Sequence, residues 1–361
     1  MIDQDDLRAA VGAGTLTESQ ATSLLTLARN RATVRAGRAP VDEPFELFRG
    51  FNEVFIVVGL GILFAGFVSL SEAVSVTTQN PDTPWTRAYN HGSVALMAFS
   101  GLTLTVLLTR YFTLRRRMIA PSIALSMAVS YFAMRIGLAA DDRFGFDFLW
   151  GPIAATGSIA LFWFWARVPF ALMLGALCFA ASCYGGAATI LSVEPDFESF
   201  FLLSGQGVFP FITLGVGALC LAAALRFDLA DRYRVTRNAA NAFWLHVAAG
   251  PMLVNPIAAT LFNLESGLTN AILLAFVVVM ALFAIAIDRR SFLLSGIGYL
   301  IALITTQLDH GGAIAIVLLG VLLITLGAKW EAIRCGLLER LPEFPGKGRL
   351  APWTACEGHL K

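Results

Sequence analysis

The chain has 361 residues, of which 57% are hydrophobic and only 14% charged, and its mean hydropathy is +0.70. Soluble globular domains carry about 25% charged residues, so this composition excludes a water-soluble protein and requires lipid as the solvent. The formal net charge is only +1. The distribution of the charges along the chain therefore carries more information than their sum.

Residues 1–40 are predicted to form a small cytosolic helix pair. Gly14 is expected to end the first helix in the left-handed conformation, and the run Thr17–Gln20 is predicted to be a capping box that opens the second helix. A pair this short buries too little surface to be stable alone, so it should dock on the cytosolic loops of this chain or on a separate protein partner. Residues 41–53 follow as an interfacial amphipathic segment in which phenylalanines recur at helical spacing.

Ten apolar stretches lie between residues 54 and 330, and each is long enough to cross the hydrocarbon core as a helix, which takes roughly 20 residues. The expected fold is therefore an all-α transmembrane helix bundle, with tight hairpins at Arg167 and at Leu308–His310. Residues 331–361 are predicted to form a cytosolic amphipathic helix and a proline-rich tail. The predicted spans are Val54–Val76, Gly92–Phe112, Met118–Ala140, Phe148–Ala166, Val168–Leu191, Gln206–Phe227, Ala240–Phe262, Leu268–Ile287, Ser291–Gln307 and Gly311–Trp330.

The basic residues alternate along the chain in a way that predicts its topology. Of the 26 Lys and Arg residues, 23 lie before the first span, after the last span or in every second connection. Only Arg87 and Arg143 lie in the opposite connections. Positively charged loops remain in the cytoplasm, so both termini are predicted to be cytoplasmic. Arginine outnumbers lysine by 23 to 3, and Ala and Gly are abundant, which hints at a high-GC bacterial genome and so at a bacterial inner membrane.

Three parts of the sequence carry a resemblance. They are the run Leu7–Ala10 together with Thr17–Ala21, the run Arg49–Phe55 at the first span, and the run Asp288–Tyr299. This combination resembles predicted bacterial membrane proteins of unknown function, over most of the chain. The resemblance implies an N-terminal cytosolic helical segment followed by many spans, and it implies no activity for any residue.

The seventh predicted span is the most irregular one. Pro251 and Pro256 interrupt it, and each removes a helical amide donor, which frees the carbonyl groups of Val247 and Met252. Broken helices with freed carbonyls near the bilayer centre form the substrate or ion sites of many secondary transporters. The alternative is a kinked helix that only packs against its neighbours.

The same span contains His246, the only histidine deep in the predicted membrane region, and Asn255 nine positions later. The two residues lie on opposite faces of a straight helix, so only a kink would bring them together. His246 is interpreted either as part of a proton relay or as a histidine that bonds a neighbouring backbone carbonyl. A haem needs a second imidazole at similar depth and a metal site needs clustered ligands, so neither a cofactor nor a metal is expected.

Arg135 is the only basic residue inside a predicted span and away from its last residues, and it shares a helix face with Tyr131 one turn earlier. A charge at the bilayer centre costs at least about 2.5–3.5 kcal/mol. The side chain should therefore reach the headgroups, pair with an outer acid such as Asp141, or face a substrate. The candidate pore-lining or ligand-lining residues are His246, Pro251, Asn255, Pro256, Arg135 and Tyr131.

Two classes of function remain open at this point. A small-solute transporter or permease would use the polar residues of the spans, whereas a non-transporting scaffold or sensor would use residues 1–40 to bind a partner. An enzyme ranks third, because no set of acid, base and nucleophile can be assembled. The clusters Arg115–Arg117 and Arg232–Arg237 lie beside spans, so anionic lipid rather than nucleic acid is their expected partner.

Overall fold

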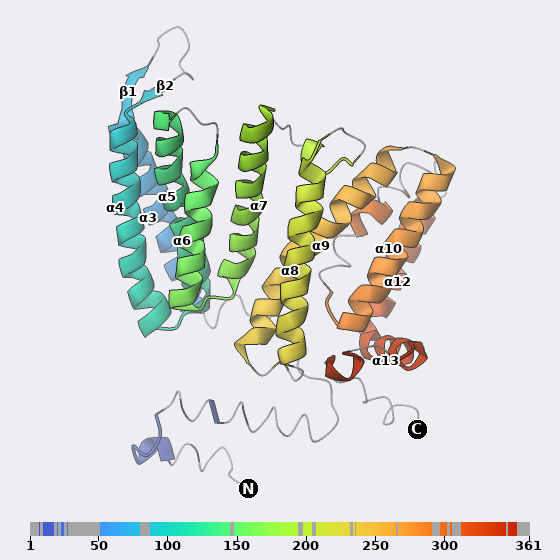
Figure 1. Cartoon of the computed structure of the whole chain (residues 1–361). Helices are drawn as coiled ribbons and strands as arrows, with labels where there is room; N and C mark the ends of the chain where they lie inside the picture. Colours follow the sequence, from blue (N-terminus) through green and yellow to red (C-terminus); the bar gives the residue numbers. More distant parts are fainter. Residues whose placement is uncertain are drawn as a thin grey trace.

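The computed structural model describes residues 7, 10–17, 20, 23–24, 27, 51–79, 87–144, 148–193, 198–203, 207–231, 234, 236–264, 266–290, 297–301, 304, 312–343 and 346–351. Helices dominate this part of the chain (Figure 1). The helices are α3 (Phe51–Ser75), α4 (His91–Thr109), α5 (Ile119–Phe144), α6 (Trp150–Ala166), α7 (Phe170–Leu191), α8 (Phe209–Ala230), α9 (Arg237–Asn263), α10 (Gly267–Ile287), α12 (Gly312–Ala328) and α13 (Trp330–Arg340). The shorter elements are the π-helix η1 (Arg110–Arg115), the 3-10 helices η2 (Glu198–Phe200) and η3 (Lys347–Arg349), and the antiparallel strands β1 (Val76–Gln79) and β2 (Arg87–Tyr89).

Within the described residues, seven helices are long and apolar enough to cross a membrane, namely α3, α4 with its continuation η1, α5, α7, α8, α9 and α10. The pair α12 and α13 is bent by 81° and would be an eighth if it formed one span. The surface of the helices is apolar, and the exposed fractions of Leu161, Ile190 and Ile324 reach 71%, 83% and 73%. Such a surface is stable in lipid and not in water, which confirms the prediction of a helical membrane protein.

The predicted spans and the helices differ in three places. The tenth predicted span, Gly311–Trp330, corresponds to α12, which has 17 residues and meets α13 at the 81° bend. The fourth predicted span corresponds to α6, which has 17 residues and is shorter than the seven helices named above. The ninth predicted span, Ser291–Gln307, lies mostly outside the described residues, and so does the hairpin at Leu308–His310. The total of ten spans therefore stays a prediction.

Two details of the N-terminal segment lie within the described residues. Gly14 has a φ angle of 70°, and its N–H donates to the carbonyl oxygen of Val11 at 3.0 Å. The N–H of Thr17 donates to the Gln20 side-chain oxygen at 3.0 Å, and the N–H of Gln20 donates to the Thr17 hydroxyl at 3.3 Å. The predicted left-handed glycine and capping box are thus confirmed. The docking of residues 1–40 and most of the interfacial segment 41–53 lie outside the described residues.

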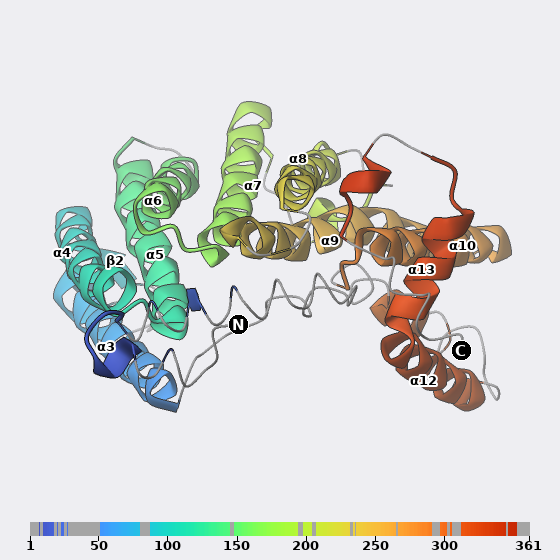
Figure 2. The same cartoon turned by 90° about the horizontal axis from the view of Figure 1, so that it is seen from below.

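The helices form a curved row rather than a closed ring. Figure 2 shows α3, α4 and α5 grouped at one end of the row, followed by α6 and α7, while α9 runs across α7, α8 and α10. The 27 residues of α9 correspond to about 40 Å of helix, which exceeds the roughly 30 Å hydrocarbon core, so α9 lies obliquely (Figure 1). The largest apolar cluster joins α7, α8, α9 and α10, and a separate cluster joins α3, α4 and α5.

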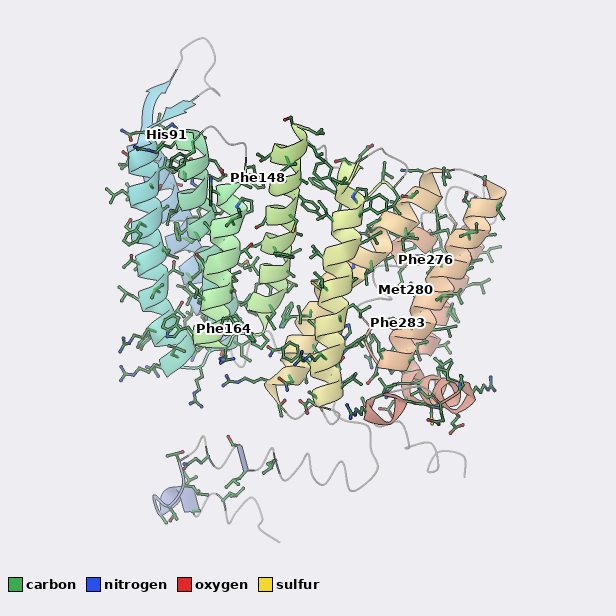
Figure 3. The ribbon with its side chains drawn as sticks, viewed as in Figure 1. His91, Phe148, Phe164, Phe276, Met280 and Phe283 are labelled. Atoms are coloured by element: carbon green, nitrogen blue, oxygen red, sulfur yellow. The ribbon has the colours of Figure 1, made fainter. Side chains whose placement is uncertain are left out.

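Most of the helices run along a common direction, and the two ends of the bundle along that direction are distinct, as Figure 3 shows. The end with the β1–β2 hairpin, His91 and Phe148 is called the hairpin end below, and the end with Phe164 and α13 is called the α13 end. The tight turn predicted at Arg167 lies at the α13 end, where Arg167 adopts a φ angle of 56° and its N–H donates to the Trp163 carbonyl at 2.9 Å. That prediction is confirmed.

Candidate functional site

A carboxylate, an imidazole and a guanidinium meet inside the bundle at the α13 end. Asp228 near the end of α8 accepts a hydrogen bond at 2.8 Å from His246 Nε2 of α9. Both Asp228 oxygens also accept from Arg289, which lies just after α10, through Nε at 3.2 Å and through Nη2. His246 and Arg289 are 0% exposed, and the Asp228 side chain is 15% exposed. We call these three residues the charged triad.

The end of α10 explains how Arg289 comes to face inward. Asp288 follows the last residue of α10 and has φ 60° and ψ 48°, the left-handed conformation that usually belongs to glycine. The N–H of Arg289 then donates to the Ala284 carbonyl at 2.9 Å. This reversal sends the side chains of Asp288 and Arg289 in different directions from adjacent positions, so that each meets a different partner.

Asp288 is the centre of a second group of polar contacts, which ties α13 to the bundle. Its carboxylate pairs with Arg234 Nη1 at 2.9 Å and accepts from Trp330 Nε1 at 2.6 Å. Arg334 of α13 lies 3.8 Å from the same carboxylate and donates to the Ala351 carbonyl at 2.9 Å. The guanidinium of Arg290 lies 5.3 Å from the centre of the Trp330 ring. The C-terminal helix is therefore held by directional contacts rather than by apolar packing alone.

The charged triad is electrically balanced when His246 is neutral, because Asp228 and Arg289 carry opposite charges. Moving a charge out of water costs several kcal/mol, and a buried pair offsets that cost only with good geometry and further hydrogen bonds. The two-oxygen contact with Arg289 and the bond from His246 supply both. A cavity of about 10 Å³ adjoins Asp228 and is lined also by Asp231, Arg234 and Ala351. That volume is about the size of a single water molecule.

His246 is the predicted residue that the structure places in the triad. Its Nε2 bonds a carboxylate rather than the backbone carbonyl considered as the alternative. Because an ionised carboxylate only accepts hydrogen bonds, Nε2 must carry the hydrogen. The neutral ring can then accept a proton at Nδ1, which makes His246 and Asp228 a pair able to hold or release one proton.

The other predicted residues of α9 are arranged differently from expectation. The helix continues through Pro251 and Pro256 without a break, so the predicted interruption is wrong. Contacts with α7, α8 and α10 support the helix where the two amide donors are missing. Pro251 is exposed, Asn255 is half-buried and Pro256 is buried. The hydrogen bonds of the triad involve none of these three residues.

Arg135 and Tyr131 lie in a separate part of the molecule, on α5. Tyr131 packs edge-on against Phe64 with ring centres 5.1 Å apart and lines an apolar cavity between α3, α4 and α5. Arg135 is half-buried one turn further along α5. Of the three alternatives for Arg135, a pair with Asp141 is not the one that the structure shows. Asp141 instead accepts backbone hydrogen bonds from Leu149, Trp150 and Gly151 at 3.1, 2.7 and 3.0 Å, and so caps the N-terminus of α6.

The predicted arginine clusters are only partly available to lipid. Arg116 is exposed, and its guanidinium donates to the Tyr111 hydroxyl from Nη2 at 3.2 Å. Arg234 belongs to the other cluster, but it is 6% exposed and pairs with Asp288, so its charge is used inside the protein. Among the described residues no group of three or more His, Cys, Asp or Glu side chains is arranged to hold a metal ion.

Sequence reasoning missed Asp228 and Arg289, which complete the triad. They are 61 positions apart in sequence, and each lies at a span end where basic residues are expected for topological reasons. The available signal was an acid beside the arginines at both places, in the runs Arg226–Asp228 and Asp288–Arg290. An acid next to a cluster of arginines is a candidate partner for an ion pair, because the opposite charges attract.

The comparisons with known proteins add no assignment to this geometry. No family model matches the sequence, and neither a curated protein nor a solved structure is significantly similar to it. The resemblance to bacterial membrane proteins of unknown function therefore stays a prediction, and the case for a function rests on the residues themselves.

Proposed function

We propose that this protein is a proton-linked permease for a small solute, and that the charged triad is its proton-binding element. The supporting observation is the placement of Asp228, His246 and Arg289 together, with exposed fractions of 15%, 0% and 0%, where membrane helices meet. Ionisable groups inside a membrane protein are costly and mark ion and proton pathways. The Asp228–Arg289 pair has no net charge, and His246 beside it can take up a proton. This arrangement is better explained by proton exchange than by helix packing alone.

Proton binding in this scheme changes the charge of the triad. With His246 neutral the triad is balanced, and a proton at Nδ1 adds one positive charge next to Arg289. Two positive charges share one carboxylate in that state, which favours admission of water and separation of α8 from α10. Loss of the proton restores the compact arrangement. The small cavity beside Asp228 is the route by which the first water would reach the carboxylate.

The solute path in this proposal follows α9. Its two prolines leave the carbonyl groups of Val247 and Met252 without a helical donor, and the half-buried Asn255 amide lies between the level of Met252 and the hairpin end. Polar groups of this kind suit recognition of a small uncharged or zwitterionic solute. The triad lies nearer the α13 end than these groups, so it would close the solute path at the α13 end.

The topology that belongs to this proposal has about ten spans in a bacterial inner membrane, with both termini in the cytoplasm. The basic stretches Arg110–Arg117, Arg167 and Arg289–Arg290 all lie at the α13 end, which supports that end as the cytoplasmic one. The triad would then close the cytoplasmic side, and Arg135 would lie towards the outer side.

The proposal is tested in proteoliposomes that contain the purified chain and an internal pH dye. Gradients of amino acids, sugars, monocarboxylates and nucleosides are applied one at a time, and one class is expected to drive proton movement. Asp228→Asn and His246→Gln should abolish this movement. Glu343→Gln is the control, because Glu343 is 90% exposed and pairs only with Lys347 among the described residues. Solute-driven proton movement that persists in both triad variants would contradict the proposal.

A second candidate function, a membrane sensor or scaffold, is favoured by the way α13 is held. Beneath this helix a cavity of about 420 Å³ is lined by Leu229, Phe283 and Leu337 of α8, α10 and α13. Polar contacts at Asp288 join α13 to the bundle beside this cavity, so their loss would release α13 towards a partner. If the protein is a sensor, Asp288→Asn should increase amide hydrogen exchange in Trp330–Arg340 and change the phenotype of cells that carry it. In the proteoliposome assay, no solute gradient should then drive proton movement.

A further inference from the structure

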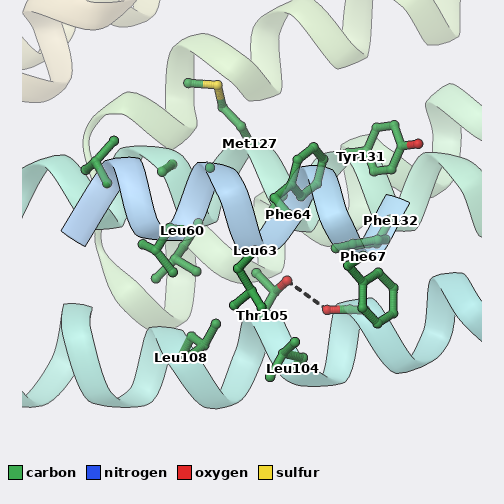
Figure 4. A pocket seen from close by; sticks show the side chains of 16 residues that line it. Leu60, Leu63, Phe64, Phe67, Leu104, Thr105, Leu108, Met127, Tyr131 and Phe132 are labelled. Atoms are coloured by element: carbon green, nitrogen blue, oxygen red, sulfur yellow. Dashed lines mark hydrogen bonds between the residues drawn. The ribbon is translucent and has the colours of Figure 1, made fainter. Parts of the chain in front are cut away.

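The apolar cavity between α3, α4 and α5 has a volume of about 390 Å³ and is lined by side chains such as Leu60, Phe64, Leu108 and Ala124. This volume falls within the roughly 300–1,000 Å³ range of ligand pockets. The hydroxyl of Thr105, a polar group on its wall, donates to the Gly101 carbonyl at 2.8 Å and so is already used (Figure 4). The cavity therefore suits an apolar chain and offers little to a polar solute.

The cavity can be reached from the membrane. Leu63 on α3 and Met127 on α5 line it, and these side chains are 47% and 48% exposed. Only 6% of the most apolar stretch of α3 is buried inside the protein. This helix is therefore packed loosely over the cavity. Because the surroundings of these helices are acyl chains, an acyl chain is the molecule that would enter.

Arg135 lies one turn beyond this cavity on the same face of α5 as Tyr131. It is half-buried, and within the described residues its guanidinium has no hydrogen bond or ion pair. The two acids that follow it on α5 are engaged elsewhere, since Asp141 caps α6 and Asp142 pairs with His91 at 3.0 Å. A positive charge at this depth therefore has no carboxylate partner in the described part of the protein, although such a charge is costly in lipid.

The direction of the Arg135 side chain is set by the helix. Helical side chains lean towards the N-terminus of their helix, which on α5 is the α13 end. A side chain that follows this tendency brings the Arg135 guanidinium over the turn that contains Tyr131. Figure 4 shows the ring of Tyr131 along the cavity wall with its hydroxyl directed away from the apolar interior. A polar headgroup beside that hydroxyl would face the arginine.

We propose that this region is a binding site for one anionic phospholipid, whose acyl chain fills the cavity between α3, α4 and α5 and whose phosphate pairs with Arg135. The guanidinium matches phosphate oxygens through two parallel hydrogen bonds. The Tyr131 hydroxyl lies at the boundary between chain and headgroup. This site is separate from the charged triad and does not depend on the proposed transport.

The test is native mass spectrometry of the full chain in detergent with added dioleoyl phosphatidylglycerol or dioleoyl phosphatidylcholine. One phosphatidylglycerol should remain bound at collision energies that remove phosphatidylcholine. Arg135→Gln should lower phosphatidylglycerol occupancy roughly fivefold, and Arg135→Lys should retain most of it. Arg143→Gln is the matched control, because Arg143 is an exposed arginine on the same helix.

The acyl-chain part of the proposal has its own variant. Ala124→Phe fills the cavity and should also lower phosphatidylglycerol occupancy, whereas Ala65→Phe on the exposed side of α3 should not. Each variant is first required to give a monodisperse protein with a cooperative thermal transition. Unchanged occupancy in Arg135→Gln, unchanged occupancy in Ala124→Phe, or equal retention of the two lipids would each overturn the proposal. Displacement of the lipid by millimolar inorganic phosphate would also overturn it, because the headgroup alone would then account for binding.

Discussion

At the scale of single residues, the charged triad makes a strong prediction about stability. Asp228→Asn keeps the size of the side chain but leaves Arg289 buried without a negative partner. Breaking one member of a buried pair typically costs about 3–5 kcal/mol, so the thermal unfolding temperature of the purified chain should fall markedly. Glu331→Gln removes an exposed charge of α13 at the same end of the protein and should change it little. Equal effects of the two substitutions would mean that the triad contributes no net stability.

Asp141 and its neighbour Asp142 provide a matched pair for the capping of α6. Asp141 is 2% exposed and receives three backbone N–H groups, whereas the Asp142 side chain is 58% exposed and pairs with His91. Asp141→Ala should destabilise the protein by about 1–2 kcal/mol because the first turn of α6 loses its acceptors. Asp142→Ala should cost about 0–1 kcal/mol. Thermal unfolding of both variants measures the difference, and the reverse order would refute the capping role.

The sequence predicted single residues unevenly. His246 and Arg135 could be selected because a charged or titratable side chain inside an apolar stretch is visible without knowledge of the fold. Their partners could not be selected in the same way. Asp228 and Arg289 are 61 positions apart and are brought together by helix packing. The inward direction of Arg289 depends on the left-handed backbone conformation of Asp288, which no sequence pattern predicted.

At the scale of helices, the contact between α5 and α6 depends on one glycine. A methyl group at Gly137 would lie 2.2 Å from the backbone oxygen of Trp150, whereas one at Gly157 on α6 meets nothing within 4 Å. Gly137→Ala should therefore push the helices apart and cost about 1–3 kcal/mol. Gly157→Ala should be neutral or stabilise slightly, since alanine favours the helix. The unfolding temperatures of the two variants test this, and similar values would contradict the close packing.

Most helices could be predicted because long apolar stretches dominate their sequences. The continuity of α9 was one of two alternatives that the sequence left open, since Pro251 and Pro256 give a strong local signal for a break that packing against α7, α8 and α10 overrides. The β1–β2 hairpin was missed as well, because it lies in a connection between spans where hydrophobic periodicity gives no signal.

At the scale of the whole molecule, helix order along the chain does not specify the curved row in Figure 2 or the oblique course of α9. Both follow from which faces of neighbouring helices fit together, and nearly uniform apolar helices carry little of that information in sequence. The separation of α3–α5 from the α7–α10 cluster divides the predicted site residues. His246, Pro251, Asn255 and Pro256 belong to α9 of the second group, while Arg135 and Tyr131 belong to α5 of the first.

Thiol labelling along α9 tests the central claim most directly, because a permease must expose this helix to water from both sides in turn. Asn255→Cys in a chain without other cysteines is treated with a charged, membrane-impermeant thiol reagent in intact spheroplasts and in inside-out vesicles. Val279→Cys on α10, at a position where the side chain is 60% exposed at the apolar surface, is the lipid-facing control and should not react. The account predicts that Asn255→Cys reacts from both sides and that Asp228→Asn changes the ratio of the two rates. Complete protection of Asn255→Cys from both sides would contradict it.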